Sequence, residues 1–238
     1  MNPYDKLLSR KRKWTPVQPT AGEIRAGSEE TMFRALALRH MELPVGDFIE
    51  DALTTEVPEV SRELLQSNVK DEINHDIALG YITDVHGVDE KAEQEAFRLR
   101  AAWEAHPDHT ITKALVAERA IFFVLLPFFR ANGDAGIRGC SADVSRDEQI
   151  HVGCNSLVHA ELGYNISPSL DKLRKATINW VMQPLKANDP IRTLNKNMWL
   201  SASDNLMYQG KAPELMFTKS ARMPAFFEHR NNDLPQYA

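Results

Sequence analysis

The sequence predicts an all-α protein. Apolar residues recur at helical spacing along most of the chain, and no Asn-Gly or Asp-Gly hairpin joins two alternating segments. Val and Ile do not cluster in runs typical of strands. Hydrophobic residues make up 43% of the 238 residues and charged residues 26%, which is enough apolar material for a core. We therefore expect one helical domain over residues 1–238.

The first long helix is expected to begin at Ser28, a good capping residue that is followed by two glutamates. Pro44 should kink or interrupt this helix, because proline lacks the N–H that the helix interior needs. The helix then continues to Leu53. Residues 1–20 contain three prolines and are predicted to form an irregular N-terminal arm.

Four further helices are expected, at residues 58–87, 88–105, 110–130 and 140–162. Pro58 occupies a favoured first-turn position, and Gly87 and Gly163 are typical helix ends. Residues 167–238 are expected to form shorter accessory helices and a tail, broken by several prolines.

Composition excludes several classes of function. The net charge of −5 argues against binding nucleic acid through general electrostatics. The longest apolar run, residues 120–129, is about half the length of a membrane span. Two cysteines cannot form a disulfide framework, and no apolar stretch follows the basic N-terminus as in a secretory signal. We therefore expect a cytoplasmic protein without a nucleic-acid or membrane partner.

Two segments of the chain share one pattern, Asp71-Glu72-Ile73-Asn74-His75 and Asp147-Glu148-Gln149-Ile150-His151. In each, Glu and His are three residues apart, which places both side chains on one helix face. Each pair also has a glutamate 30 positions upstream of its own Glu. Thirty residues let one helix end and the next return beside it. The sequence thus repeats one half of a metal site. The six predicted ligands are Glu42, Glu72, His75, Glu118, Glu148 and His151.

Charge supports a dinuclear metal site. Four carboxylates in a core would be costly without compensation, and two divalent cations would neutralise them. An oxygen-rich set with one imidazole per metal suits iron or manganese rather than zinc held by thiolates. We predict two iron ions, with manganese or a mixed manganese–iron pair as alternatives.

The first ligand leaves alternatives open, because Pro44 lies two positions after Glu42 and disturbs the local helix. Glu30 or Glu50 could replace it. Asp71 and Asp147 are expected just outside the ligands, since a ligating histidine usually donates its other ring N–H to a carboxylate.

These residues resemble the ferritin-like di-iron carboxylate superfamily, in which two helices supply a Glu and two others supply Glu-x-x-His. The doubled motif resembles bacterial multicomponent monooxygenases and arylamine N-oxygenases, and the segment Arg146 to His151 resembles ribonucleotide reductase small subunits. The resemblance implies a four-helix bundle with additional C-terminal helices, and it places Trp14 near the metal. Two C-terminal segments, residues 199–205 and 226–230, are similar to the same family.

The resemblance implies an oxidoreductase that activates O2, with an external electron donor. We expect an oxidase or oxygenase that acts on a small organic substrate, and a homodimer as its assembly. The alternative is a compact ribonucleotide reductase small subunit. Those subunits usually carry a radical Tyr four residues after the first ligand His, where this chain has Leu79, and Tyr81 is displaced by two residues. Iron oxidation and storage is less expected, because the long stretch after residue 162 exceeds a single bundle.

Overall fold

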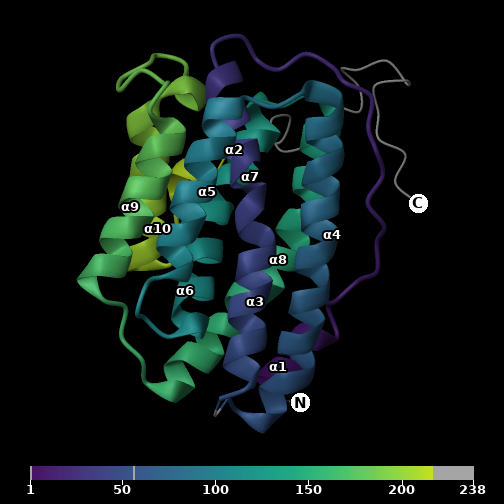
Figure 1. Ribbon diagram of the computed structural model, residues 1–238, viewed down its shortest axis with the longest axis vertical. Helices are drawn as coiled ribbons and strands as arrows, with labels where there is room; N and C mark the ends of the chain where they lie inside the picture. Colours follow the sequence, from purple (N-terminus) through teal and green to yellow (C-terminus); the bar gives the residue numbers. More distant parts are fainter. Residues whose placement is uncertain (1, 56, 217–238) are drawn as a thin grey trace.

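The computed structural model describes residues 2–55 and 57–216, and within them every regular element is helical. Four helical rods form a bundle (Figure 1). Helix α3 packs on α4 and α6, and α8 packs on α4, α6 and α7. The first rod contains α3 (Glu42–Leu53) and the second is α4 (Arg62–His86). The third contains α6 (Thr110–Ala117) and α7 (Phe123–Asn132), and the fourth is α8 (Ala135–Leu162). The all-α prediction is confirmed.

The rod that contains α3 is broken one turn before its proline. Helix α2 (Glu29–Ala37) leads into the 3-10 segment η1 (Leu38–Met41), and α3 starts at Glu42. Pro44 is the third residue of α3, where a backbone N–H would have no partner within the helix. The interruption therefore precedes Pro44 and leaves Glu42 in a first helical turn.

The expected helix over 110–130 contains a wider turn. Helix α6 passes into the π-helical segment η3 (Glu118–Phe122) before α7 resumes the α geometry. Such turns often occur at functional sites, because the extra residue changes where the side chains point. Here the wide turn starts at Glu118.

The N-terminal arm contains a short helix, which corrects the expectation of an irregular segment over 1–20. Asn2 caps α1 (Pro3–Leu8) by accepting a hydrogen bond from the Asp5 N–H. Residues 11–25, which we call the strap, follow without regular structure. The strap runs antiparallel to the first half of α8: Arg12 binds Asp143, and the Gly22 N–H binds Asp134 at the start of α8. In Figure 1 this segment passes along the outside of the bundle.

Three further helices cover one side of the bundle, namely α5 (Glu90–Glu104), α9 (Pro168–Met182) and α10 (Lys196–Gln209). Helices α9 and α10 both pack on η3. Arg174 of α9 is fully buried and binds Ser203 and Asp204 of α10, which joins these two helices. They correspond to the accessory helices expected after residue 167. The C-terminal motif at residues 226–230 lies outside the described residues.

None of the described helices combines the length and the apolar character that crossing a membrane requires.

Candidate metal centre

The structure brings all six predicted ligands together in the middle of the bundle. Each rod supplies its share: α3 carries Glu42, α4 carries Glu72 and His75, η3 carries Glu118, and α8 carries Glu148 and His151. Glu42 is 4% exposed and the other five are fully buried. Of the alternatives for the first ligand, Glu30 and Glu50 are exposed. Glu42 is therefore the residue that joins the cluster.

The first half-site surrounds His75. Its Nδ1 atom lies 3.6 Å from Glu42 Oε2, 3.3 Å from Glu72 Oε2 and 3.4 Å from Glu148 Oε1. These four residues each direct one ligand atom to a common point, with all four atoms within 4.8 Å of one another.

The second half-site surrounds His151. Its Nδ1 atom lies 2.8 Å from Glu72 Oε1, 3.7 Å from Glu118 Oε1 and 3.7 Å from Glu148 Oε1. The two imidazole rings are 5.6 Å apart between centroids. Glu72 and Glu148 therefore face both histidines, whereas Glu42 and Glu118 each face only one of them. The two half-sites therefore lie side by side and share two carboxylates.

Unsatisfied buried atoms show that this cluster is suited to cations. Within the described residues, Glu118 Oε1 and both oxygens of Glu148 have no hydrogen-bond partner. Leaving such groups unpaired in a core costs about 1–3 kcal/mol each. Cations at the two positions would satisfy them, so the buried Glu/His cluster can hold metal ions.

The pKa values of the cluster without metal reflect the same crowding. Burial raises the pKa of Glu42 and of Glu118 well above the ordinary value for a glutamate, and nearby carboxylates raise it further. Burial would lower the pKa of His151, but the negative charge of Glu72 outweighs it and raises that pKa to about 10. Protons thus stand in for the positive charge that metal ions would bring.

Each histidine also contacts an aspartate on the opposite helix. His75 of α4 has its Nε2 atom 3.5 Å from Asp147 Oδ2 of α8. Trp14 of the strap donates its indole N–H to the same oxygen at 2.6 Å. Trp14, Asp147 and His75 thus form a connected path from the strap to the first half-site.

The second half-site has the same kind of contact with the two helices exchanged, so that the histidine comes from α8 and the aspartate from α4. His151 of α8 has its Nε2 atom 3.0 Å from Asp71 Oδ2 of α4, and Lys11 of the strap forms an ion pair with that carboxylate. The structure therefore places both aspartates and Trp14 next to the histidines.

Two neighbours of the cluster were not identified from the sequence. Asn155 donates a hydrogen bond to Glu118 Oε2 at 2.6 Å, and it lies four residues after His151 on the same face of α8. This four-residue spacing could have identified Asn155 from the sequence as a neighbour of the cluster. Lys11 has no such signal, because its contacts are to α4 and α8 rather than to residues near it in sequence.

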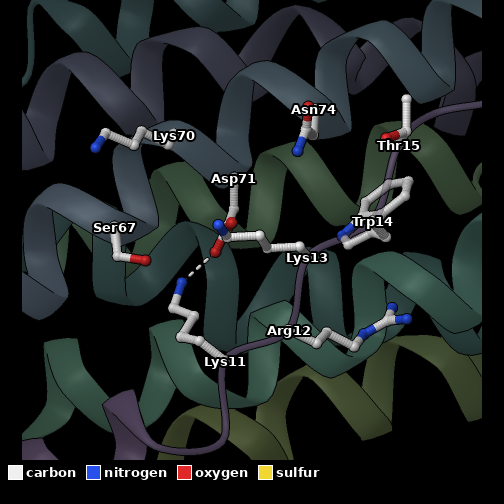
Figure 2. A pocket seen from close by; sticks show the side chains of 9 residues that line it. All are labelled: Lys11, Arg12, Lys13, Trp14, Thr15, Ser67, Lys70, Asp71 and Asn74. Atoms are coloured by element: carbon white, nitrogen blue, oxygen red, sulfur yellow. Dashed lines mark hydrogen bonds and ion pairs between the residues drawn. The ribbon is translucent and has the colours of Figure 1, made fainter.

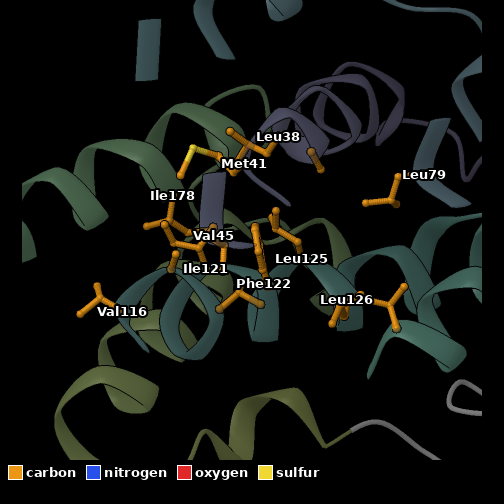
Figure 3. Close-up of a cluster of buried hydrophobic side chains, with 14 of the residues drawn as sticks. Leu38, Met41, Val45, Leu79, Val116, Ile121, Phe122, Leu125, Leu126 and Ile178 are labelled. Carbon is orange, nitrogen blue, oxygen red and sulfur yellow. The ribbon is translucent and has the colours of Figure 1, made fainter. Parts of the chain in front are cut away.

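A small apolar cavity of about 10 Å³ adjoins Glu42. This volume is close to the minimum that holds one water molecule. Leu79 and Phe122 line it, together with side chains of η1, α7 and α8, and no described Tyr does. Figure 3 shows several of these buried side chains around the interface of η1, α4 and α7. The space beside the cluster is therefore small and lined mainly by apolar side chains.

Four other described histidines have partners outside the cluster. His109 is half-buried, and its Nδ1 atom accepts the Ile111 N–H and caps α6. His106 contacts Ser169, His40 contacts Glu93 and His86 contacts Asp134. These side chains have structural partners.

The all-α fold has a counterpart among solved structures, and the buried carboxylate and histidine cluster could hold metal ions. A crystal structure from Bacillus halodurans, of a protein described as a candidate class I ribonucleotide reductase, has a TM-score of 0.58 to this chain. The match covers 90% of this chain and 94% of that one at 14% sequence identity, so it shows a shared fold. No protein-family model matches the sequence, and neither does any curated protein.

Proposed function

We propose that the protein is an O2-dependent oxidoreductase that uses two metal ions, iron in the first instance. The main support is that two half-sites share Glu72 and Glu148 within one buried cluster. His75 and Glu42 would hold one ion, and His151 and Glu118 the other. Iron bound in this way supplies reaction with O2 and stores oxidising equivalents.

The residues of the chain have separate tasks in this proposal. The four carboxylates would balance the charge of the ions, and Asp147 and Asp71 orient the two imidazoles so that each Nδ1 faces the carboxylate cluster. The cavity beside Glu42 is lined mainly by apolar side chains, which would keep the approach of O2 to the cluster largely apolar. Trp14 is a candidate route for electrons from an external donor, because it is half-buried and hydrogen-bonded to Asp147.

Two functions remain as candidates for how the oxidised metal site would be used. Oxidation of a small organic substrate is supported by Leu79, since leucine cannot hold the stable radical of a reductase subunit. A ribonucleotide reductase small subunit without a radical Tyr is supported by the similarity to the Bacillus halodurans protein. The small cavity favours the second candidate, because an organic substrate that entered through it would have to displace Leu79 or its neighbours.

The deciding experiment starts from anaerobic protein loaded with Fe(II). We expect about two iron ions per chain and rapid O2 consumption, followed by no long-lived tyrosyl signal in electron paramagnetic resonance. A folded sample that takes up no iron would refute the proposal. A stable tyrosyl radical that disappears in Tyr81→Phe would instead make the chain a conventional radical-generating subunit.

Leu79→Ala separates the two candidates. Enlarging the cavity should speed oxidation of added small aromatic or aliphatic substrates if substrate oxidation is the function. Val158→Ala, a buried change elsewhere in the core, is the matched control for lost stability. Unchanged substrate oxidation in a stable Leu79→Ala protein would favour the reductase candidate.

A further inference from the structure

A polar cleft of about 530 Å³ opens between the strap and α4. One wall is formed by residues 11–15 of the strap, and the other by α4 side chains from Ser67 to Asn74 (Figure 2). Its volume falls within the range of small-molecule binding sites. It lies outside the metal ligands, on the side where Lys11 and Trp14 contact the two aspartates.

The cleft is positively charged, although the chain as a whole carries a net charge of −5. Its lining residues include four cations and one carboxylate; the cations are Lys11, Arg12, Lys13 and Lys70, and the carboxylate is Asp71. Lys11 is already paired with Asp71, and Arg12 is paired with Asp143. Two positive charges of the cleft are therefore left over.

Those two charges belong to Lys13 and Lys70. Both side chains are exposed, and neither has an ion pair or a hydrogen bond to any residue in 2–55 or 57–216. Lys70 has no acidic neighbour three or four positions away on α4 that could pair with it. The two ammonium groups are thus available to a ligand.

Neutral polar groups in the same cleft are also available. Ser67, Asn74 and Thr15 line it, and within the described part of the chain their side chains make no hydrogen bond. Hydroxyl and amide groups can donate to an anion without changing its charge. The cleft therefore combines two free cations with several free donors.

We propose that this cleft binds a small dianion of the phosphate-ester class. Two unpaired ammonium groups match two negative charges, and lysine binds phosphate as a point charge without needing the planar geometry that arginine imposes. The site requires no metal ion and goes beyond the proposed oxidoreductase function.

Isothermal titration calorimetry tests the proposal with glycerol 3-phosphate and with sulfate, at constant ionic strength. Sulfate is included because it is a dianion with little affinity for iron. We expect both to bind at one site per chain, and Lys13→Gln together with Lys70→Gln to weaken binding by at least about tenfold. Lys172→Gln, which removes an exposed lysine of α9, is the matched control and should bind as the parent does.

Equal affinity in the double variant and the parent would overturn the proposal. Binding that disappears when metal is removed from a protein that stays folded would also overturn it, since the ligand would then sit on the ions. Binding of sulfate without glycerol 3-phosphate would exclude the phosphate-ester class.

Discussion

The two half-sites are alike in their ligands and different in what supports them. In each, a histidine faces the cluster with Nδ1 and contacts an aspartate of the opposite helix with Nε2. On the His75 side that aspartate is fully buried and is held by the indole of Trp14. On the His151 side it is 13% exposed and is held by the ammonium of Lys11. The repeat in the sequence therefore produces symmetric ligands, and the unrepeated strap makes the two sides unequal.

The largest expected effect comes from removing one imidazole. His151→Ala should lower the iron content after anaerobic loading from about two ions per chain to one or fewer, because buried carboxylates lose a partner. Elemental analysis measures this directly. His106→Ala removes a loop imidazole that contacts Ser169 and should keep the iron content of the parent. Equal iron in both variants would contradict the assignment of His151.

Metal binding should weaken as the pH falls. In the metal-free protein the pKa of His75 is raised well above its ordinary value, and that of His151 is raised to about 10, in each case because carboxylates outweigh burial. Both rings therefore carry protons at neutral pH, and these must leave before Nδ1 can bind metal. Calorimetry in buffers of different ionisation enthalpy should detect released protons. An affinity that stays constant between about pH 6 and 8 would refute this coupling.

A change in the strap should affect the two half-sites differently. Trp14→Phe removes both the oxidisable ring and the N–H that binds Asp147, so reduction of the oxidised protein by a chemical donor should slow several-fold. Lys11→Gln removes a charge on the other side and should leave this rate unchanged. Stopped-flow absorbance of the ferric protein measures it. Similar slowing in both variants would show that the strap acts as one unit, without a route through Trp14.

The smallest effect on the difference between the two half-sites should come from a substitution at the contact between Asp134 and the C-terminal part of the strap. Asp134 accepts hydrogen bonds from the Gly22 N–H and the Ile137 N–H, so Asp134→Ala should cost about 1–3 kcal/mol of unfolding free energy. Asp89→Ala removes an ordinary cap of α5 and should cost less. Urea denaturation compares the two, and iron content should be unchanged in both. If Asp134→Ala lost iron from one half-site only, this contact would not support the two half-sites equally.

Much of the candidate metal centre could be predicted because its residues follow short-range spacing patterns in the sequence. The pairs Glu72–His75 and Glu148–His151 are each set by helical spacing, and the equal distance to Glu42 and Glu118 follows from helices that return beside each other. The structure places all of these side chains in one cluster, whereas their binding of metal stays a prediction.

The features that were missed depend on contacts between distant segments or on small changes of helical geometry. A helical pattern cannot show that Asp71 of α4 serves His151 of α8, or that Lys11 approaches that aspartate from the strap. The π turn at Glu118 and the short helix α1 were also missed. An extra residue in one turn hardly alters an apolar periodicity, and a six-residue helix is too short to show one.

The position of the strap bears on the order in which the protein assembles. Lys11 and Asp71 are 60 residues apart in the chain, and Trp14 and Asp147 are 133 apart. Closing such long loops costs entropy before any contact repays it, so these contacts should form after the local packing of the bundle. All six predicted ligands lie within residues 42–151, so the helices that carry them can pack together before the strap binds. We therefore expect a folding stage in which the cluster is assembled but still open on its histidine side, when metal ions can enter by a path that the finished protein covers.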